Sequence, residues 1–265
     1  MRLTEIRTDP RPVAIARIGV GLATILNSIE AYEILGAIAS GKLATPVFPA
    51  APAPTLPWLL AFVVLAVGAA MAVTIGWNTE VAAIVSVLLS VVVLLWDQQT
   101  YSSHRLLATL LLSYLVFARA GTAWSVRPVP GSPTVVWWPQ LLMMTQLSVL
   151  YLFSALSKIN LLFISGKPLA MWVWIELPWQ FYTVAAFMTI VVELVIAFGL
   201  WFPASRRVAV AFGLGLHLSI VVLMNHETLS LIAFALTCIS LYPLFLFRPR
   251  VRGSRTHAEN QVAMA

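Results

Sequence analysis

The sequence contains 265 residues, of which 60% are hydrophobic and only 10% are charged. Soluble domains carry about 25% charged residues, so this composition excludes a soluble globular protein and indicates an integral membrane protein. The net charge is +6, but no basic helix and no interleaving of basic and aromatic residues accompanies it, so we expect no nucleic-acid partner. The single cysteine, Cys238, excludes a disulfide within the chain and a dithiol redox motif.

Apolar runs of about 17–25 residues divide the chain, and no alternating strand pattern competes with them. We therefore predict an all-α, polytopic helical membrane protein. About eight transmembrane helices are expected: 13–38, 56–75, one ending at 96, one ending near 118, a central one beginning at 138, 180–201, one ending at 224 and one ending near 247. Ser102 or Ser103 is the expected N-cap of the fourth.

The segment 161–179 follows the central helix and is predicted not to cross the membrane. Gly166, Pro168 and Pro178 interrupt it, and it is rich in tryptophan. Glycine and proline break helices, and tryptophan favours the membrane–water boundary. We therefore expect an interfacial or re-entrant segment here.

The basic residues predict the orientation of the chain. Eight spans place both termini on one side, and if that side is cytoplasmic it collects twelve of the sixteen Lys and Arg residues, as the positive-inside rule requires. The other side keeps Lys42, Arg105, Lys158 and Lys167. We expect one helical transmembrane domain over residues 1–247 and a basic, polar, disordered cytoplasmic tail over 248–265. Although residues 37–40 resemble a signal-peptidase site, we expect no cleavage, because the apolar run before them is longer than a typical signal.

This orientation gathers polar side chains at the outer end of the bundle, with His217 about 12 Å deeper at 1.5 Å per helical residue. Ionisable groups at membrane depth are costly and usually face one another or water. We therefore predict a cavity that opens outward. The gathered residues are Glu30, Glu33, Asp97, His104, Arg105, Lys158, Asn160, Lys167, Glu176, Asn225, His226 and Glu227.

Lys158 ends the central apolar run, and Tyr151, Ser154 and Lys158 share one helical face at spacings i, i+3 and i+7. One reading is that the lysine only extends its ammonium to the interface. The other is that it lies in an apolar pocket, where loss of water makes its proton easier to lose and suits it to proton abstraction.

Five further ionisable side chains need an interpretation. His104 is either an ordinary interfacial histidine or a neutral hydrogen-bonding group at a helix start. His217, which follows Gly213 and Gly215 on the same helix, implies close helix packing and a polar partner. Glu193 is either that partner or the acceptor for a hydroxyl on a nearby helix. For Glu30 and Glu33 we favour a solvated helix end. No short metal-binding spacing occurs, so we expect no metal site.

Several stretches together resemble a known family. They are YSSHRLL at 101–107, QLSVLYLFSALSKIN at 146–160, GKPL at 166–169 and LGLHLSI at 214–220. The pattern is similar to the HTTM membrane domain of vitamin K-dependent gamma-carboxylases and their bacterial relatives, and the likeness covers roughly residues 12–247.

The resemblance implies an integral membrane enzyme in which Lys158 is the base that deprotonates an isoprenoid hydroquinone of the vitamin K or menaquinol type, and His104 assists. O2 and CO2 are then co-substrates of the carboxylation. His217, Tyr151 and Trp172 are the candidate cofactor-binding residues. The implied location is the bacterial cytoplasmic (inner) membrane, with the site on the outer side.

The carboxylases carry a large luminal domain that follows the membrane part and helps to bind the substrate. This sequence has only a short tail there, on the opposite side. A peptide or lipid-linked substrate would therefore need a partner protein for its recognition. The alternative function is a non-catalytic membrane subunit or scaffold that binds a partner protein or membrane lipids in the same cavity. A small transporter is a weaker alternative, because no repeat is visible.

Overall fold

The computed structural model describes residues 3–42, 44–48, 53–128, 133–224, 228–247 and 250–251. Within these ranges, seven helices are long and apolar enough to cross a membrane, which confirms an all-α, multi-pass membrane protein. They are α1 (Arg11–Ala39), α2 (Leu56–Ile75), α3 (Thr79–Trp96), α5 (Trp138–Ser157), α8 (Trp179–Gly199), α9 (Arg206–Leu223) and α10 (Thr228–Leu246).

The eighth expected span is α4 (Ser103–Phe117), an apolar helix of 15 residues. At 1.5 Å per residue it is about 22 Å long, which is shorter than the hydrocarbon core of a bilayer. Ser102 is its N-cap, and the Ser102 hydroxyl accepts a hydrogen bond from the Arg105 N–H at 3.3 Å. The helix is short but begins where the sequence predicts.

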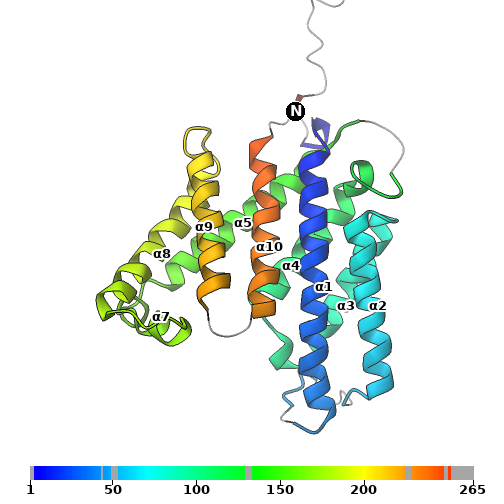
Figure 1. Cartoon of the computed structure of the whole chain (residues 1–265). Coiled ribbons are helices and arrows are strands. Elements are labelled where there is room, and N and C mark those ends of the chain that lie inside the picture. The colour runs from blue at the N-terminus through cyan, green and yellow to red at the C-terminus, as the bar shows by residue number, and fades with distance from the viewer. Residues whose placement is uncertain are drawn as a thin grey trace, which may run out of the picture.

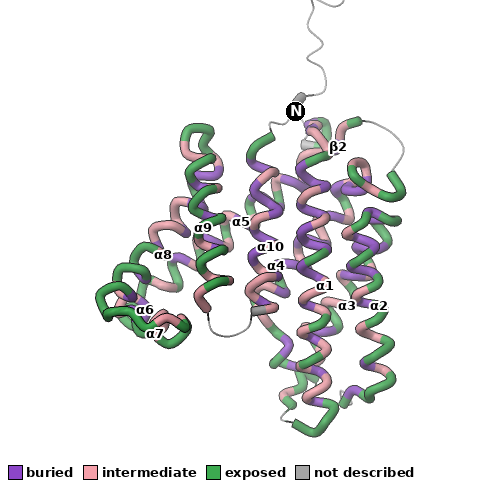
Figure 2. The backbone as a smooth tube through the Cα atoms, viewed as in Figure 1, coloured by how far each residue is buried: buried purple, intermediate pink, exposed green. Residues whose placement is uncertain are grey.

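Helix α1 is the centre of the larger group of helices and packs along α2 and α10 (Figure 1). Glycines allow the close approach, because a Cβ added at Gly19 would meet the side chain of Ser240, and one added at Gly21 would meet Thr74. In the apolar window of α1, 61% of the residues are buried, compared with 17% in α9. Exposed positions instead line the outer faces of α2, α3, α8 and α9 (Figure 2), where lipid would surround them.

A small antiparallel sheet joins distant parts of the chain at one end of the bundle. Strand β1 (Ile6–Thr8) pairs with β2 (Val135–Val136) and with β3 (Arg250–Val251). The beginning of α1 and the end of α10 therefore lie at the same end (Figure 1). A chain whose first and last helices have their free ends on the same side needs an even number of membrane crossings. The seven long helices together with α4 would give eight.

Arg17 explains how the linker after α4 is held at this end. The side chain is fully buried on α1, and its guanidinium donates hydrogen bonds to the carbonyl oxygens of Ala120 at 2.9 Å and Trp124 at 2.6 Å. It also bonds the Ser125 hydroxyl. A charged side chain is tolerated inside a membrane helix here because backbone carbonyls take up its donors.

The segment predicted not to cross is two short helices, α6 (Leu161–Ile164) and α7 (Lys167–Trp172). Gly166 separates them with φ +80°, and a Cβ there would meet the backbone of Tyr182 and Thr183. After α7 the chain runs along the end of α9, where the Trp174 N–H donates to the Leu223 carbonyl at 3.1 Å. The prediction is confirmed: residues 161–178 turn back at one end of the bundle.

Candidate functional site

Lys158 follows the last residue of α5 and meets a carboxylate from α8. The Lys158 Nζ lies 2.9 Å from Oε1 and 3.0 Å from Oε2 of Glu193. The Ser154 hydroxyl, one turn back on α5, donates to Glu193 Oε1 at 2.9 Å and lies 2.5 Å from Lys158 Nζ. The side chains of Lys158, Glu193 and Ser154 therefore form one closed hydrogen-bonded set. We call its two charged members, Lys158 and Glu193, the lysine–glutamate pair.

The lysine–glutamate pair is largely shielded from solvent between α5 and α8, with Glu193 buried and Lys158 half-buried. Glu193 is 5% exposed, and the side chain of Lys158 is 23% exposed. Glu193 is fourteen residues after Trp179, the first residue of α8, which places it about 21 Å along that helix. Phe163 of α6 covers the ammonium with its ring centroid 5.8 Å from Nζ, a cation–π distance. Water has only partial access to this charge.

A second polar set lies deeper and is fully buried. The hydroxyl of Tyr151 on α5 is hydrogen-bonded to Nε2 of His217 on α9 at 2.6 Å and to the hydroxyl of Tyr242 on α10 at 2.7 Å. A Cβ added at Gly213, one turn before His217, would meet Tyr242. The sequence predicts close packing and a polar partner for His217, and both are present.

A third set connects α1, α4 and α10. His104 Nε2 is 2.6 Å from the Ser230 hydroxyl and 3.9 Å from Glu30 Oε2, while Arg105 Nη2 pairs with that same carboxylate oxygen at 2.9 Å. The expected solvated helix end is therefore wrong for Glu30, whose side chain is 21% exposed, and fits the exposed Glu33. Both contacts of His104 use one ring nitrogen, so this set lacks the geometry of a Ser-His-acid triad.

The structure distributes the candidate residues over separate sets. Lys158 and His104 share no hydrogen bond or ion pair in the part of the chain that the structure describes. The His104 ring on α4 contacts Phe234, which contacts His217, and His217 in turn contacts Tyr151 on α5. Trp172 is 44% exposed on α7 and belongs to none of the three sets among the described contacts. Their roles in binding and catalysis stay predictions, and Asn225, His226 and Glu227 lie outside the described residues.

Sequence reasoning did not find the partner of Lys158. Two readings of Glu193 were open, and the structure selects the hydroxyl of Ser154 instead of His217. The available signal was a lone carboxylate in an otherwise apolar helix, which requires a partner in the membrane. Among the described residues, no group of three or more His, Cys, Asp or Glu side chains could hold a metal ion.

The fold and the three polar sets define a multi-pass membrane protein with ionisable groups buried between its helices. A family model described as the HTTM domain matches residues 6–249, nearly the whole chain, so the chain belongs to the HTTM family. It is therefore a gamma-carboxylase-like membrane domain, as the sequence motifs indicate. No curated protein and no solved structure gives a match.

Proposed function

We propose that this protein is a membrane enzyme that uses an isoprenoid hydroquinone of the vitamin K or menaquinol type, with Lys158 as the base. The lysine–glutamate pair is the observation that supports this proposal. Intramembrane ionisable groups are costly and mark functional sites. This pair places a lysine, a carboxylate and a hydroxyl within 3.0 Å of one another, at the stretch whose motif resembles the carboxylases most closely.

The pair provides a way for the lysine to act as a base. A base must be neutral, whereas an ion-paired lysine carries a proton. Transfer of that proton from Nζ to a Glu193 oxygen 2.9 Å away replaces two charges with two neutral groups, and this neutral form becomes more favourable when an apolar molecule displaces water. Neutral Nζ then accepts a proton from a phenolic hydroxyl, while Ser154 keeps its bond to the carboxyl group.

Apolar surface at the end of α5 fits a hydroquinone and its tail. The ring of Phe163, a buried residue, lies beside Nζ, and Phe153 and Leu156 are 64% and 47% exposed on other faces of the last turns of α5. Exposed aromatic and aliphatic side chains suit a quinone ring and an isoprenoid tail. When bound, the hydroquinone supplies, through its reaction with O2, the strong base that carboxylation by CO2 requires. The chain's own residues hold the ring and move its proton.

The proposal extends to location and substrate. We place the protein in the bacterial inner membrane with both termini cytoplasmic, because the positively charged end, with Arg7 and Arg17, is also the end that carries the sheet. The end with α6 and α7 then faces outward. The modified substrate is a peptide or a lipid-linked molecule, and a partner protein provides its recognition.

A second candidate is a non-catalytic membrane subunit that holds a partner protein or lipid. Two observations favour it: Lys158 is fully hydrogen-bonded to Glu193 and Ser154, as a structural ion pair would be, and His104 belongs to another set. In this reading the pair fixes α5 against α8.

Quinone epoxide formation separates these candidates. The purified protein in nanodiscs is mixed with a reduced naphthoquinol and O2, and epoxide is followed by mass spectrometry. We expect epoxide from the wild type and from Lys167→Ala, which removes an exposed lysine of α7, and a loss of at least 100-fold in Lys158→Ala, as is typical when a general base is removed. Equal epoxide formation by Lys158→Ala and the wild type, or no epoxide from the wild type, would contradict the proposed enzymatic function.

A further inference from the structure

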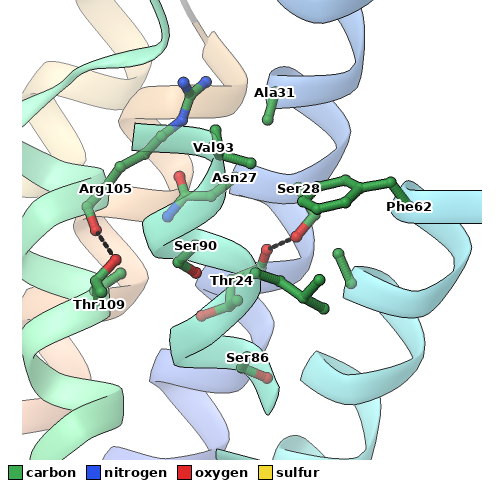
Figure 3. Close-up of a pocket in the computed structure, with 13 residues that line it drawn as sticks. Thr24, Asn27, Ser28, Ala31, Phe62, Ser86, Ser90, Val93, Arg105 and Thr109 are labelled. Carbon is green, nitrogen blue, oxygen red and sulfur yellow. Dashed lines mark hydrogen bonds between the residues drawn. The ribbon is translucent and has the colours of Figure 1, made fainter. Parts of the chain in front are cut away.

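A partly open cavity with both polar and apolar lining residues lies between α1, α2, α3 and α4 (Figure 3). Helices α1, α3 and α4 supply its polar side, and α2 supplies Phe62 and Ala66. The seven polar side chains that line the cavity are Thr24, Asn27, Ser28, Ser86, Ser90, Arg105 and Thr109. Neither Lys158 nor Glu193 is among the lining residues.

The cavity lies between the middle of α1, the middle of α3 and the first two turns of α4. Thr24 is thirteen residues after the start of α1 and fifteen before its end, and Ser86 is seven residues after the start of α3 and ten before its end. Polar side chains are costly in the middle of membrane helices and are retained where they bind something. Neither the HTTM motifs nor the proposed reaction at Lys158 assigns a role to the polar side chains that line this cavity.

The hydrogen bonds of the cavity show which ligand chemistry it suits. Thr24 donates to the Val20 carbonyl at 2.7 Å and Thr109 to the Arg105 carbonyl at 2.9 Å. These hydroxyl protons are used internally, so the hydroxyl oxygens have only accepting capacity left.

Among the residues that the structure describes, three buried polar atoms of lining side chains have no hydrogen-bond partner. They are the amide oxygen of Asn27, the hydroxyl of Ser86 and Nε of Arg105. Buried polar groups normally have hydrogen-bond partners, and a molecule in the cavity would supply the partners that these three side chains lack within the protein. The lining offers acceptors, such as the oxygens of Thr24 and Asn27, and donors, such as the Ser86 hydroxyl and Arg105 Nε, so the best ligand group both donates and accepts a hydrogen bond. A hydroxyl does both.

Size and access narrow the ligand further. The cavity offers about 30 Å³ to the centres of water-sized groups, and one such group needs about 10–15 Å³. The cavity therefore holds about two water-sized groups. This volume suits the CH2–OH end of an alcohol and is too small for a quinone ring. Phe62 and Leu89 line the cavity and are partly exposed on the outer faces of α2 and α3, so an apolar chain can extend from it into lipid.

We propose that the cavity between α1 and α4 binds the terminal hydroxyl of an uncharged long-chain alcohol that enters from the bilayer. The hydroxyl donates its one proton to the Thr24 oxygen and accepts a hydrogen bond from the Ser86 hydroxyl, and its chain leaves past Phe62. Arg105 contributes no net charge because it is paired with Glu30, which excludes an anionic head group. This site is independent of any reaction at Lys158.

Native mass spectrometry of the full chain in detergent tests the proposal, with farnesol, dodecan-1-ol and farnesyl methyl ether as probes. The ether keeps the chain but lacks the O–H donor. The substitution Thr24→Val removes the hydroxyl and keeps the side-chain shape. Its matched control is Thr237→Val, because Thr237 is buried on α10, makes the same bond to a carbonyl four residues back, and does not line the cavity.

We expect the wild type to bind at least one alcohol, with the stronger of the two identifying the preferred chain. Binding of the ether should be about tenfold weaker, and Thr24→Val should weaken alcohol binding about fivefold, as the loss of one hydrogen bond implies. Thr237→Val should change it less than twofold. The proposal is overturned if neither alcohol binds, which would leave water as the occupant, if ether and alcohol bind equally, or if both valine variants lose binding alike.

Discussion

The lysine–glutamate pair predicts strongly non-additive effects on stability. Glu193→Gln leaves the Lys158 ammonium in the bundle without its carboxylate, and Lys158→Met leaves a carboxylate that is 5% exposed. Removing one partner of a buried ion pair costs about 3–5 kcal/mol, whereas replacing both partners is often nearly neutral. Because Lys158 has some access to water, we expect about 2 kcal/mol for Glu193→Gln, about 3 for Lys158→Met and about 2 for the double variant.

The coupling energy is therefore about 3 kcal/mol, at the upper end for neighbouring residues. The measurement is the free energy of unfolding of all four proteins in mixed micelles by SDS titration, followed by tryptophan fluorescence. Lys167→Met is the control and should cost less than about 0.5 kcal/mol, because Lys167 is exposed. Additive costs of the two substitutions would refute the ion pair as a buried, coupled unit.

Three further predictions use the same unfolding measurement. Tyr151→Phe removes a hydroxyl that is bonded to both α9 and α10, which should cost about 1–3 kcal/mol through the partners left unsatisfied; a loss below about 0.5 would contradict the network. Gly213→Ala should destabilise because its Cβ meets Tyr242, whereas Gly215→Ala, with open space around it, should be neutral or gain up to about 1 kcal/mol of helix propensity; equal effects would count against the packing. Arg17→Met should cost about 3 kcal/mol and make the 120–125 linker accessible to proteases, because it leaves the buried Ala120 carbonyl oxygen and the half-buried Trp124 carbonyl oxygen without donors; an unchanged cleavage pattern would argue that Arg17 does not hold this linker.

The helices could be predicted from the sequence because a bilayer requires long apolar runs with internally satisfied backbones. The end of α3 at Trp96, the capping of α4 by Ser102 and the break at Gly166 all follow from local chemistry. Arg17 shows where this reasoning stops. The sequence shows that Arg17 is a basic residue near the start of an apolar helix, but its buried contacts with residues 120–125 depend on how α1 meets a distant linker.

The polar sets depend on the same kind of long-range contact. His217 could be expected to have a partner, but the choice of Tyr151 is set by the crossing of α5 and α9. Glu30 was misread because its helix end looks solvated along the sequence, whereas Arg105 arrives from α4 to pair with it. A single sequence shows which residues need polar partners, but the packing of the helices decides which partner each of them has.

The most direct test of the enzyme is Lys158→Arg, with epoxide formation and unfolding measured on the same preparation. Arginine keeps the charge that pairs with Glu193 but does not lose its proton at accessible pH. We expect stability within about 1 kcal/mol of the wild type, together with loss of epoxide formation. Full epoxide formation by Lys158→Arg would contradict a role for Lys158 as the base and would leave the lysine–glutamate pair as a structural contact.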